Sequence, residues 1–169
     1  MSAEAAGQGT SDVTPVAWGE RLAGFYREIG ARAMRDLPIY HDALDVEAIG
    51  FSVVEGRILG IVVTPWFMNV VTPAAQGSAG SVVKIVLPAG SFEFTIGDIA
   101  GIGRIASCSL FSPMFQFDDM VAARAAAEAA LAALMTAPED DLSSERAAKA
   151  SSTIDRRAFL RGTLSEGRA

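Results

Sequence analysis

The chain has 169 residues, of which 50% are hydrophobic and 20% are charged, and its formal net charge is −6. This length suits one domain with extended ends, and the apolar share is large enough to bury a core. The acidic balance argues against nucleic-acid binding and against docking on anionic lipid, because both need clustered Lys and Arg. The single cysteine, Cys108, excludes an internal disulfide and suits a reducing compartment.

The N-terminal residues 1–13 are small, polar and acidic, and they contain neither a basic region nor an apolar stretch. This composition predicts a disordered leader and no secretory signal. The longest apolar runs, near Ile58–Val63 and Val82–Leu87, are far shorter than the roughly 20 residues that a membrane span requires. We therefore expect a soluble, cytoplasmic protein that does not bind membranes.

The elements expected along the chain begin with a helix. Thr14 and Pro15 form a helix start, an apolar stripe at helical spacing runs from Trp18 to Ile29, and Pro38 closes the helix. Runs rich in β-branched and aromatic residues then predict five strands, over residues 46–54, 57–64, 82–87, 91–96 and 104–110. In the run 91–96, alternation predicts that Phe92, Phe94 and Ile96 face one side of the sheet. Asp118 and Asp119 open an alanine-rich helix that reaches about Met135 and ends before Pro138.

This order of elements predicts an α+β fold. An antiparallel sheet of about five strands is flanked by the N-terminal helix and the C-terminal alanine-rich helix, with disordered tails at both ends. The expected domain covers residues 14–137, and residues 138–169 are interpreted as a flexible tail.

Catalytic and cofactor sites find little support in the sequence. The only histidine, His41, and Cys108 lack a recognisable orienting motif for a Cys–His pair, and a structural zinc site needs more ligands than these. Residues 101–106 match the relaxed dinucleotide pattern G-x-G-x-x-A, but the residues that follow alternate like a strand instead of forming a helix. We interpret these glycines as a hairpin loop and expect no cofactor and no metal.

Two segments combine aromatic residues and methionine with a proline that interrupts the sheet. Their residues are predicted to bind a partner: Thr64, Pro65, Trp66, Phe67, Met68 and Asn69 in the first, and Cys108, Ser109, Leu110, Phe111, Ser112, Pro113 and Met114 in the second. Large apolar side chains on interrupted strands cannot all point inward, so exposed anchors are expected among Trp66, Phe67, Met68, Leu110, Phe111 and Met114. The alternative is that both segments simply seal the ends of the core.

The same segments carry a family resemblance. Gly60–Asn69 (GIVVTPWFMN) is similar to a signature of the HybE/HupJ chaperones of nickel–iron hydrogenase assembly. Leu87–Phe94 (LPAGSFEF) and Cys108–Phe115 (CSLFSPMF) resemble two further blocks of that family, and Leu44–Phe51 (LDVEAIGF) resembles a fourth. The resemblance covers about residues 16 to 135, with the blocks in the expected order.

This resemblance implies a non-catalytic accessory protein for maturation of a membrane-bound nickel–iron uptake hydrogenase. Its implied partners are a small- or large-subunit precursor, bound in the cytoplasm before twin-arginine export, and other maturation proteins. The competing hypothesis is a thiol- or metal-handling maturation factor that uses Cys108.

The tail carries one short motif, because Asp155–Arg161 (DRRAFLR) resembles the core of a twin-arginine export signal. Its position near the C-terminus, with no apolar region after it, excludes a working signal. One interpretation is a short basic amphipathic segment. The other is imitation of the client's signal, in which Arg156 and Arg157 occupy the partner-binding site of the same chain.

Overall fold

The computed structural model describes residues 13–138 and contains two α-helices, a π-helical turn and six strands. The helices are α2 (Pro15–Ile29) and α3 (Met120–Leu134), and η1 (Gly30–Met34) is a π-helical continuation of α2. The strands are β1 (Glu47–Val54), β2 (Arg57–Val63), β3 (Met68–Pro73), β4 (Val82–Leu87), β5 (Gly90–Ile99) and β6 (Gly103–Phe111). The predicted leader and tail lie almost wholly outside the described residues.

All the strands form one antiparallel sheet in the order β1-β2-β3-β6-β5-β4, so the predicted α+β class is confirmed. The sheet has six strands and not five, because Met68–Pro73 forms a strand that the sequence analysis did not predict. The predicted hairpin loop after Ile99 is also present, and Gly103 begins strand β6. The dinucleotide pattern at residues 101–106 therefore leads into a strand.

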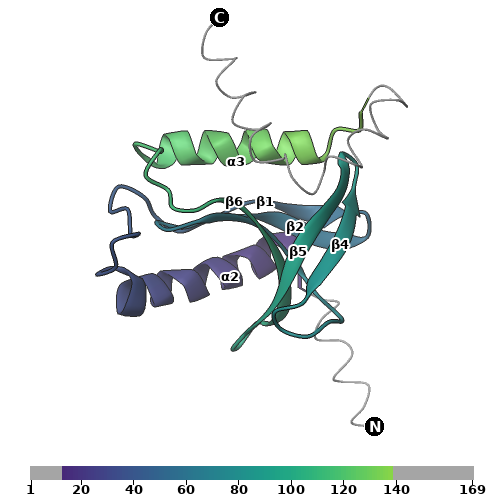
Figure 1. Cartoon of the computed structure of the whole chain (residues 1–169), viewed down its shortest axis with the longest axis horizontal. Helices are drawn as coiled ribbons and strands as arrows, with labels where there is room; N and C mark the ends of the chain where they lie inside the picture. The colour runs from purple at the N-terminus through teal and green to yellow at the C-terminus, as the bar shows by residue number, and fades with distance from the viewer. Residues whose placement is uncertain (1–12, 139–169) are drawn as a thin grey trace, which may run out of the picture.

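The two helices cover opposite faces of this sheet, so the domain has three layers (Figure 1). The α3 face carries the larger core cluster, which includes the predicted alternating residues Phe92, Phe94 and Ile96 of β5. The α2 face carries a second cluster, in which Trp18 and Leu22 of α2 pack against residues of β1, β2, β3 and β6. Strand β2 contributes to both clusters, as expected for a central strand that is apolar on both sides.

Helix α2 approaches the sheet closely because two glycines leave room for one aromatic ring. A Cβ atom added at Gly60 would lie 2.4–2.6 Å from ring atoms of Phe51, and one added at Gly19 would lie 2.5 Å from the same ring. Trp18 also packs edge-on against Phe51, with ring centroids 5.7 Å apart. The Phe51 ring is therefore enclosed between α2 and β2.

Polar contacts fix the start of each helix and the end of α3. Thr14 caps α2, since its Oγ1 accepts a hydrogen bond from the backbone of Ala17 at 3.1 Å, and Asp119 caps α3 in the same way. At the other end of α3, the Leu134 carbonyl accepts a 3.0 Å bond from the Ala89 backbone in the β4–β5 turn. The chain therefore leaves the domain beside that turn.

No helix in residues 13–138 has both the length and the apolar character that crossing a bilayer requires.

Candidate partner-binding site

The two proline-containing segments meet at one end of the sheet. The first segment forms the tight turn between β2 and β3 and the start of β3, and the second forms the end of β6 and the turn after it. Strands β3 and β6 pair through Met68 and Phe111. The hydroxyl of Ser112 donates a 3.4 Å hydrogen bond to the carbonyl of Trp66 and so joins the two segments directly. This end lies at the left of Figure 1, where the loops before β1 and before α3 also lie.

A buried hydroxyl shapes the first segment. The Oγ1 atom of Thr64 accepts hydrogen bonds from the backbone of Trp66 (3.2 Å) and Phe67 (2.9 Å) and donates to the Phe67 carbonyl at 3.1 Å. The Thr64 backbone also donates to that carbonyl at 2.8 Å. Because the hydroxyl is fully buried, losing these bonds would leave it unsatisfied, so it fixes the turn.

Trp66 is the centre of an aromatic cluster and is only 6% exposed. Its ring stacks on Tyr40 with centroids 6.1 Å apart and meets the edges of Tyr26 and Phe67 at 6.3 and 5.6 Å. Burial in this cluster raises the pKa of Tyr26 to about 12, so its hydroxyl stays protonated at physiological pH. A Cβ atom at Gly30 would lie 3.3 Å from the Trp66 ring, which places η1 against the same cluster.

These positions correct the expectation of exposed anchors. The side chains of four expected anchors are buried: Trp66, Met68, Leu110 and Met114. The prolines do interrupt the strands, but the tight turns that follow direct the large side chains back into the core. After Met114, for example, a turn closed by the Phe117 backbone and the Met114 carbonyl keeps the methionine inside. These four residues agree with the alternative, in which the two segments seal the ends of the core.

The other predicted residues differ in exposure. Thr64 and Pro65 are buried, and Ser112 and Pro113 are exposed; five are partly buried: Phe67, Asn69, Cys108, Ser109 and Phe111. In the described part of the chain, the buried Oδ1 atom of Asn69 has no hydrogen-bond partner. Cys108 lies on β6 and packs against the larger core cluster. Arg156 and Arg157 lie outside the described residues.

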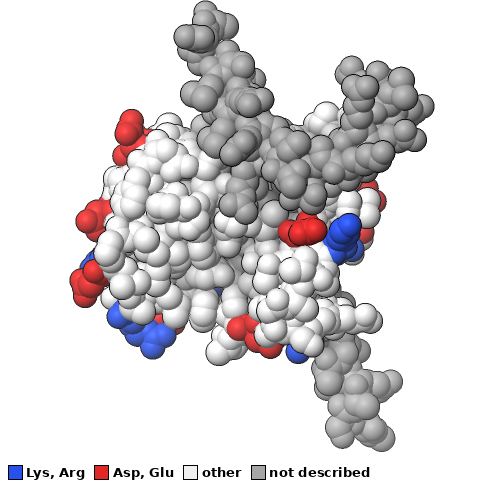
Figure 2. Space-filling view, viewed as in Figure 1, with Lys and Arg blue, Asp and Glu red and all other residues white. Residues whose placement is uncertain are grey.

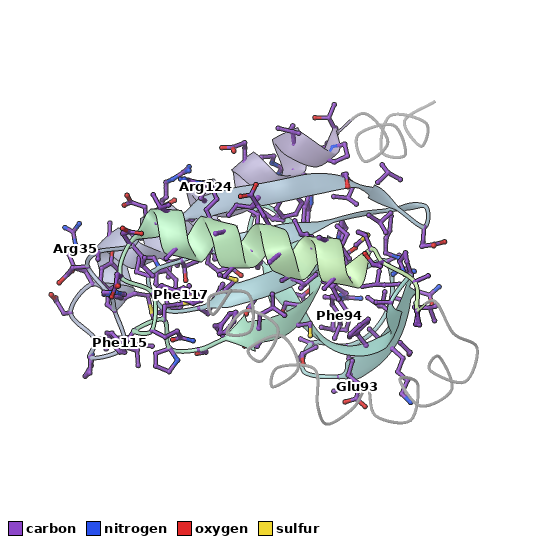
Figure 3. All side chains as sticks on the ribbon, turned by 90° about the horizontal axis from the view of Figure 1, so that it is seen from above. Arg35, Glu93, Phe94, Phe115, Phe117 and Arg124 are labelled. Carbon is purple, nitrogen blue, oxygen red and sulfur yellow. The ribbon has the colours of Figure 1, made fainter. Side chains whose placement is uncertain are left out.

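Exposed apolar side chains do occur at this end, on the loop before β1, which the sequence analysis did not single out, and at Phe115, the last residue of the block Cys108–Phe115, which was not among the predicted binding residues. Leu37 and Ile39 precede β1 and are 44% and 40% exposed, and Phe115 precedes α3 and is 51% exposed. In Figure 3, Phe115 and Phe117 lie at the end of the molecule where α3 begins. The sequence signal that could have identified these residues is an apolar side chain close to a proline and an aspartate, in a stretch without the periodicity of a strand or a helix.

His41 joins these loops to the first segment. Its backbone donates a 2.9 Å hydrogen bond to the Pro65 carbonyl, its Nε2 atom donates to the Phe117 carbonyl at 2.7 Å, and its ring lies 5.4 Å from that of Phe115. The ring therefore positions two loops that are far apart in the sequence. These contacts give His41 a structural role.

Carboxylates surround the exposed apolar residues. Asp36, Asp42 and Asp118 are exposed, and none of the three forms an ion pair within residues 13–138. Figure 2 shows acidic side chains along the left margin, over the loops before β1 and α3, with basic side chains beside and below them. We call the following group the end surface: Asp36, Leu37, Ile39, Asp42, Phe115 and Asp118.

A polar cavity of about 410 Å³ opens beside the end surface, between η1 and the start of β1. It is lined by residues of both charges, including Arg27, Arg35, Asp45 and Glu47. Hydrogen bonds from Arg124 lower the pKa of Glu47, whose carboxylate it contacts at 2.7 and 2.8 Å. Among residues 13–138, no three His, Cys, Asp or Glu side chains are grouped closely enough to hold a metal ion.

Comparison with known proteins gives a consistent result. A family model described as "[NiFe]-hydrogenase assembly, chaperone, HybE" matches residues 17–162. The chain is 62% identical to the hydrogenase expression/formation protein HupJ of Bradyrhizobium diazoefficiens over 93% of this chain and 95% of that protein. It is 38% identical to HoxT of Azotobacter vinelandii, over 86% and 95% of the two chains. The solution structure of HybE from Escherichia coli superposes with a TM-score of 0.58 at 26% identity, covering 75% of this chain and 80% of that one.

Proposed function

Since the chain belongs to the HybE family of nickel–iron hydrogenase assembly chaperones, we propose that its client is an immature subunit of a membrane-bound uptake hydrogenase. The protein is a hydrogenase assembly chaperone and not an enzyme. In the proposed role it holds a small- or large-subunit precursor in the cytoplasm until twin-arginine export, together with other maturation proteins.

The main support for this proposal is that the two motif segments meet beside the exposed apolar residues of the end surface. The segments pair through Met68 and Phe111 and are joined by the Ser112 hydrogen bond. His41 then ties the loops that carry Leu37, Ile39 and Phe115 to the same place. Exposed apolar side chains grouped at one place are typical of a surface that binds another protein.

Within this proposal the predicted site residues have two roles. The buried members support the surface from below: Thr64, Pro65, Trp66, Met68, Leu110 and Met114. The more accessible members extend the contact area beside the end surface: Phe67, Asn69, Ser109, Phe111, Ser112 and Pro113. The partner therefore touches the ends of the motifs, while the tryptophan and the methionines keep the shape of the loops.

The proposal is tested by pull-down from cells that accumulate separate small- and large-subunit precursors. The full chain should retain a precursor, and Phe115→Ser should weaken its binding by about 30-fold, the loss of one interface anchor of about 2 kcal/mol. Val121→Ser is the matched control, since Val121 is 71% exposed on α3 but lies outside the end surface. Capture of neither precursor by the unaltered chain would refute the proposed client.

The alternative of a thiol- or metal-handling factor is tested at Cys108. Because its side chain packs against the larger core cluster, native Cys108 should be labelled slowly by thiol reagents. Cys108→Ala should retain precursor binding and hydrogenase maturation. Loss of maturation with the fold intact would instead favour a direct role for the thiol.

A further inference from the structure

We propose that the end surface is a docking site for the tail of the same chain. The occupant is the segment Asp155–Arg161, and a client precursor must displace it. The part of this inference in which a client displaces the tail rests on the proposed function. The contact between tail and domain can be tested without a client.

Charge and apolar character are complementary between the two partners. The loops of residues 35–45 and 112–119 carry five aspartates and a single arginine, a formal charge of −4. That arginine, Arg35, lines the polar cavity, as does Asp45. The tail segment carries three arginines, one aspartate and the apolar pair Phe159 and Leu160. Arginine can form two charge-assisted hydrogen bonds with one carboxylate, and the apolar pair matches the exposed side chains between the aspartates.

The tail is long enough to reach the end surface. It leaves the domain at the far end of α3, a helix of 15 residues that spans about 22 Å. Eighteen residue steps separate Pro138 from Arg156. A flexible chain of that length has a root-mean-square extent of about 23 Å and a maximum of about 60 Å. The segment can therefore reach the start of α3 without strain.

Because the tail is tethered to the domain, even a weak contact would keep it docked most of the time. A linker of this length gives an effective concentration of about 1 mM, so a segment that binds in trans with a Kd of about 100 µM would be roughly 90% docked. Docking would cover Leu37, Ile39 and Phe115 while no client is present. The apparent affinity for a competing peptide would fall by about tenfold.

The direct test compares ¹⁵N spectra of full-length variants. Arg156→Glu with Arg157→Glu should shift the backbone amides of residues 36–42 and 115–118, because the tail leaves the end surface. Arg146→Glu with Lys149→Glu is the matched control, since it makes the same charge change in the same tail. No shift in the first variant, or the same shift in both, would overturn the inference.

Substitutions on the domain give an independent check. Phe115→Ser should release the tail as the arginine variant does, and Val121→Ser should not. Asp36→Arg with Asp42→Arg should release the tail in the unaltered background and restore docking when Arg156 and Arg157 are both glutamate. Failure of both release and restoration would show that the tail does not bind through these carboxylates.

Displacement of the tail by a client is tested by titrating the full chain with the synthetic peptide Ser-Arg-Arg-Ala-Phe-Leu-Lys, which has the core sequence of a twin-arginine export signal. The variant with glutamate at positions 156 and 157 should bind it about tenfold more tightly than the unaltered chain. Equal affinities would overturn the inference, and the proposed function would stand if precursors are still captured. Tail docking without any precursor capture would have the opposite meaning, since the inferred contact would hold and the proposed client would fail.

Discussion

Replacing Trp66 with alanine should destabilise the fold strongly, because the side chain is a core residue and not an exposed anchor. The ring is 6% exposed and contacts three aromatic rings, those of Tyr26, Tyr40 and Phe67. Truncating a buried tryptophan costs about 3–5 kcal/mol, and each aromatic pair adds roughly 0.5–1.5 kcal/mol beyond its buried area. We therefore expect a loss of about 4 kcal/mol, a large share of the stability of a domain of this size.

Urea denaturation of the full chain measures this loss, and thermal melting should show a fall in Tm of about 15 °C. Phe115→Ala is the matched comparison, since Phe115 is half exposed and should lose less than about 1 kcal/mol. Trp66→Phe should recover part of the stability. A loss below 1 kcal/mol for Trp66→Ala, with precursor binding abolished, would refute this reasoning and restore the exposed-anchor hypothesis.

Three further substitutions test how the two helices are held against the sheet. Gly60→Ala should cost about 2–3 kcal/mol in urea denaturation, because its Cβ atom would meet the ring of Phe51, whereas Gly24→Ala, on an open helix surface, should stabilise slightly. Arg124→Gln should lower the Tm slightly at pH 7. The pKa of Glu47 is lowered by Arg124, so the stabilisation is present above the ordinary value of 4.5 and is lost as the pH falls through the folded-state pKa. An equal effect of Arg124→Gln at pH 7 and pH 3 would contradict the assignment.

The sequence by itself determined the elements whose signals are local. Thr14 and Pro15 marked the start of α2, and Asp119 marked the start of α3, because caps act within one helical turn. Alternation predicted the buried face of β5, since side chains on a strand point in turn to opposite sides. The motif Gly60–Asn69 also identified the family, because ten consecutive residues make a specific match.

Only the tertiary structure decided which side chains of the candidate site are exposed. Strand β3 was missed because it is short, lies between two prolines and is completed by pairing with β6, about 40 residues further along the chain. Trp66 is buried because η1 and Tyr40 cover it, and no local pattern encodes that packing. The exposed residues Leu37 and Phe115 come from separate loops, and His41 of the first loop joins them through its hydrogen bond to the Phe117 carbonyl of the second. Exposure depends on neighbours that are distant in the sequence, so it required the fold.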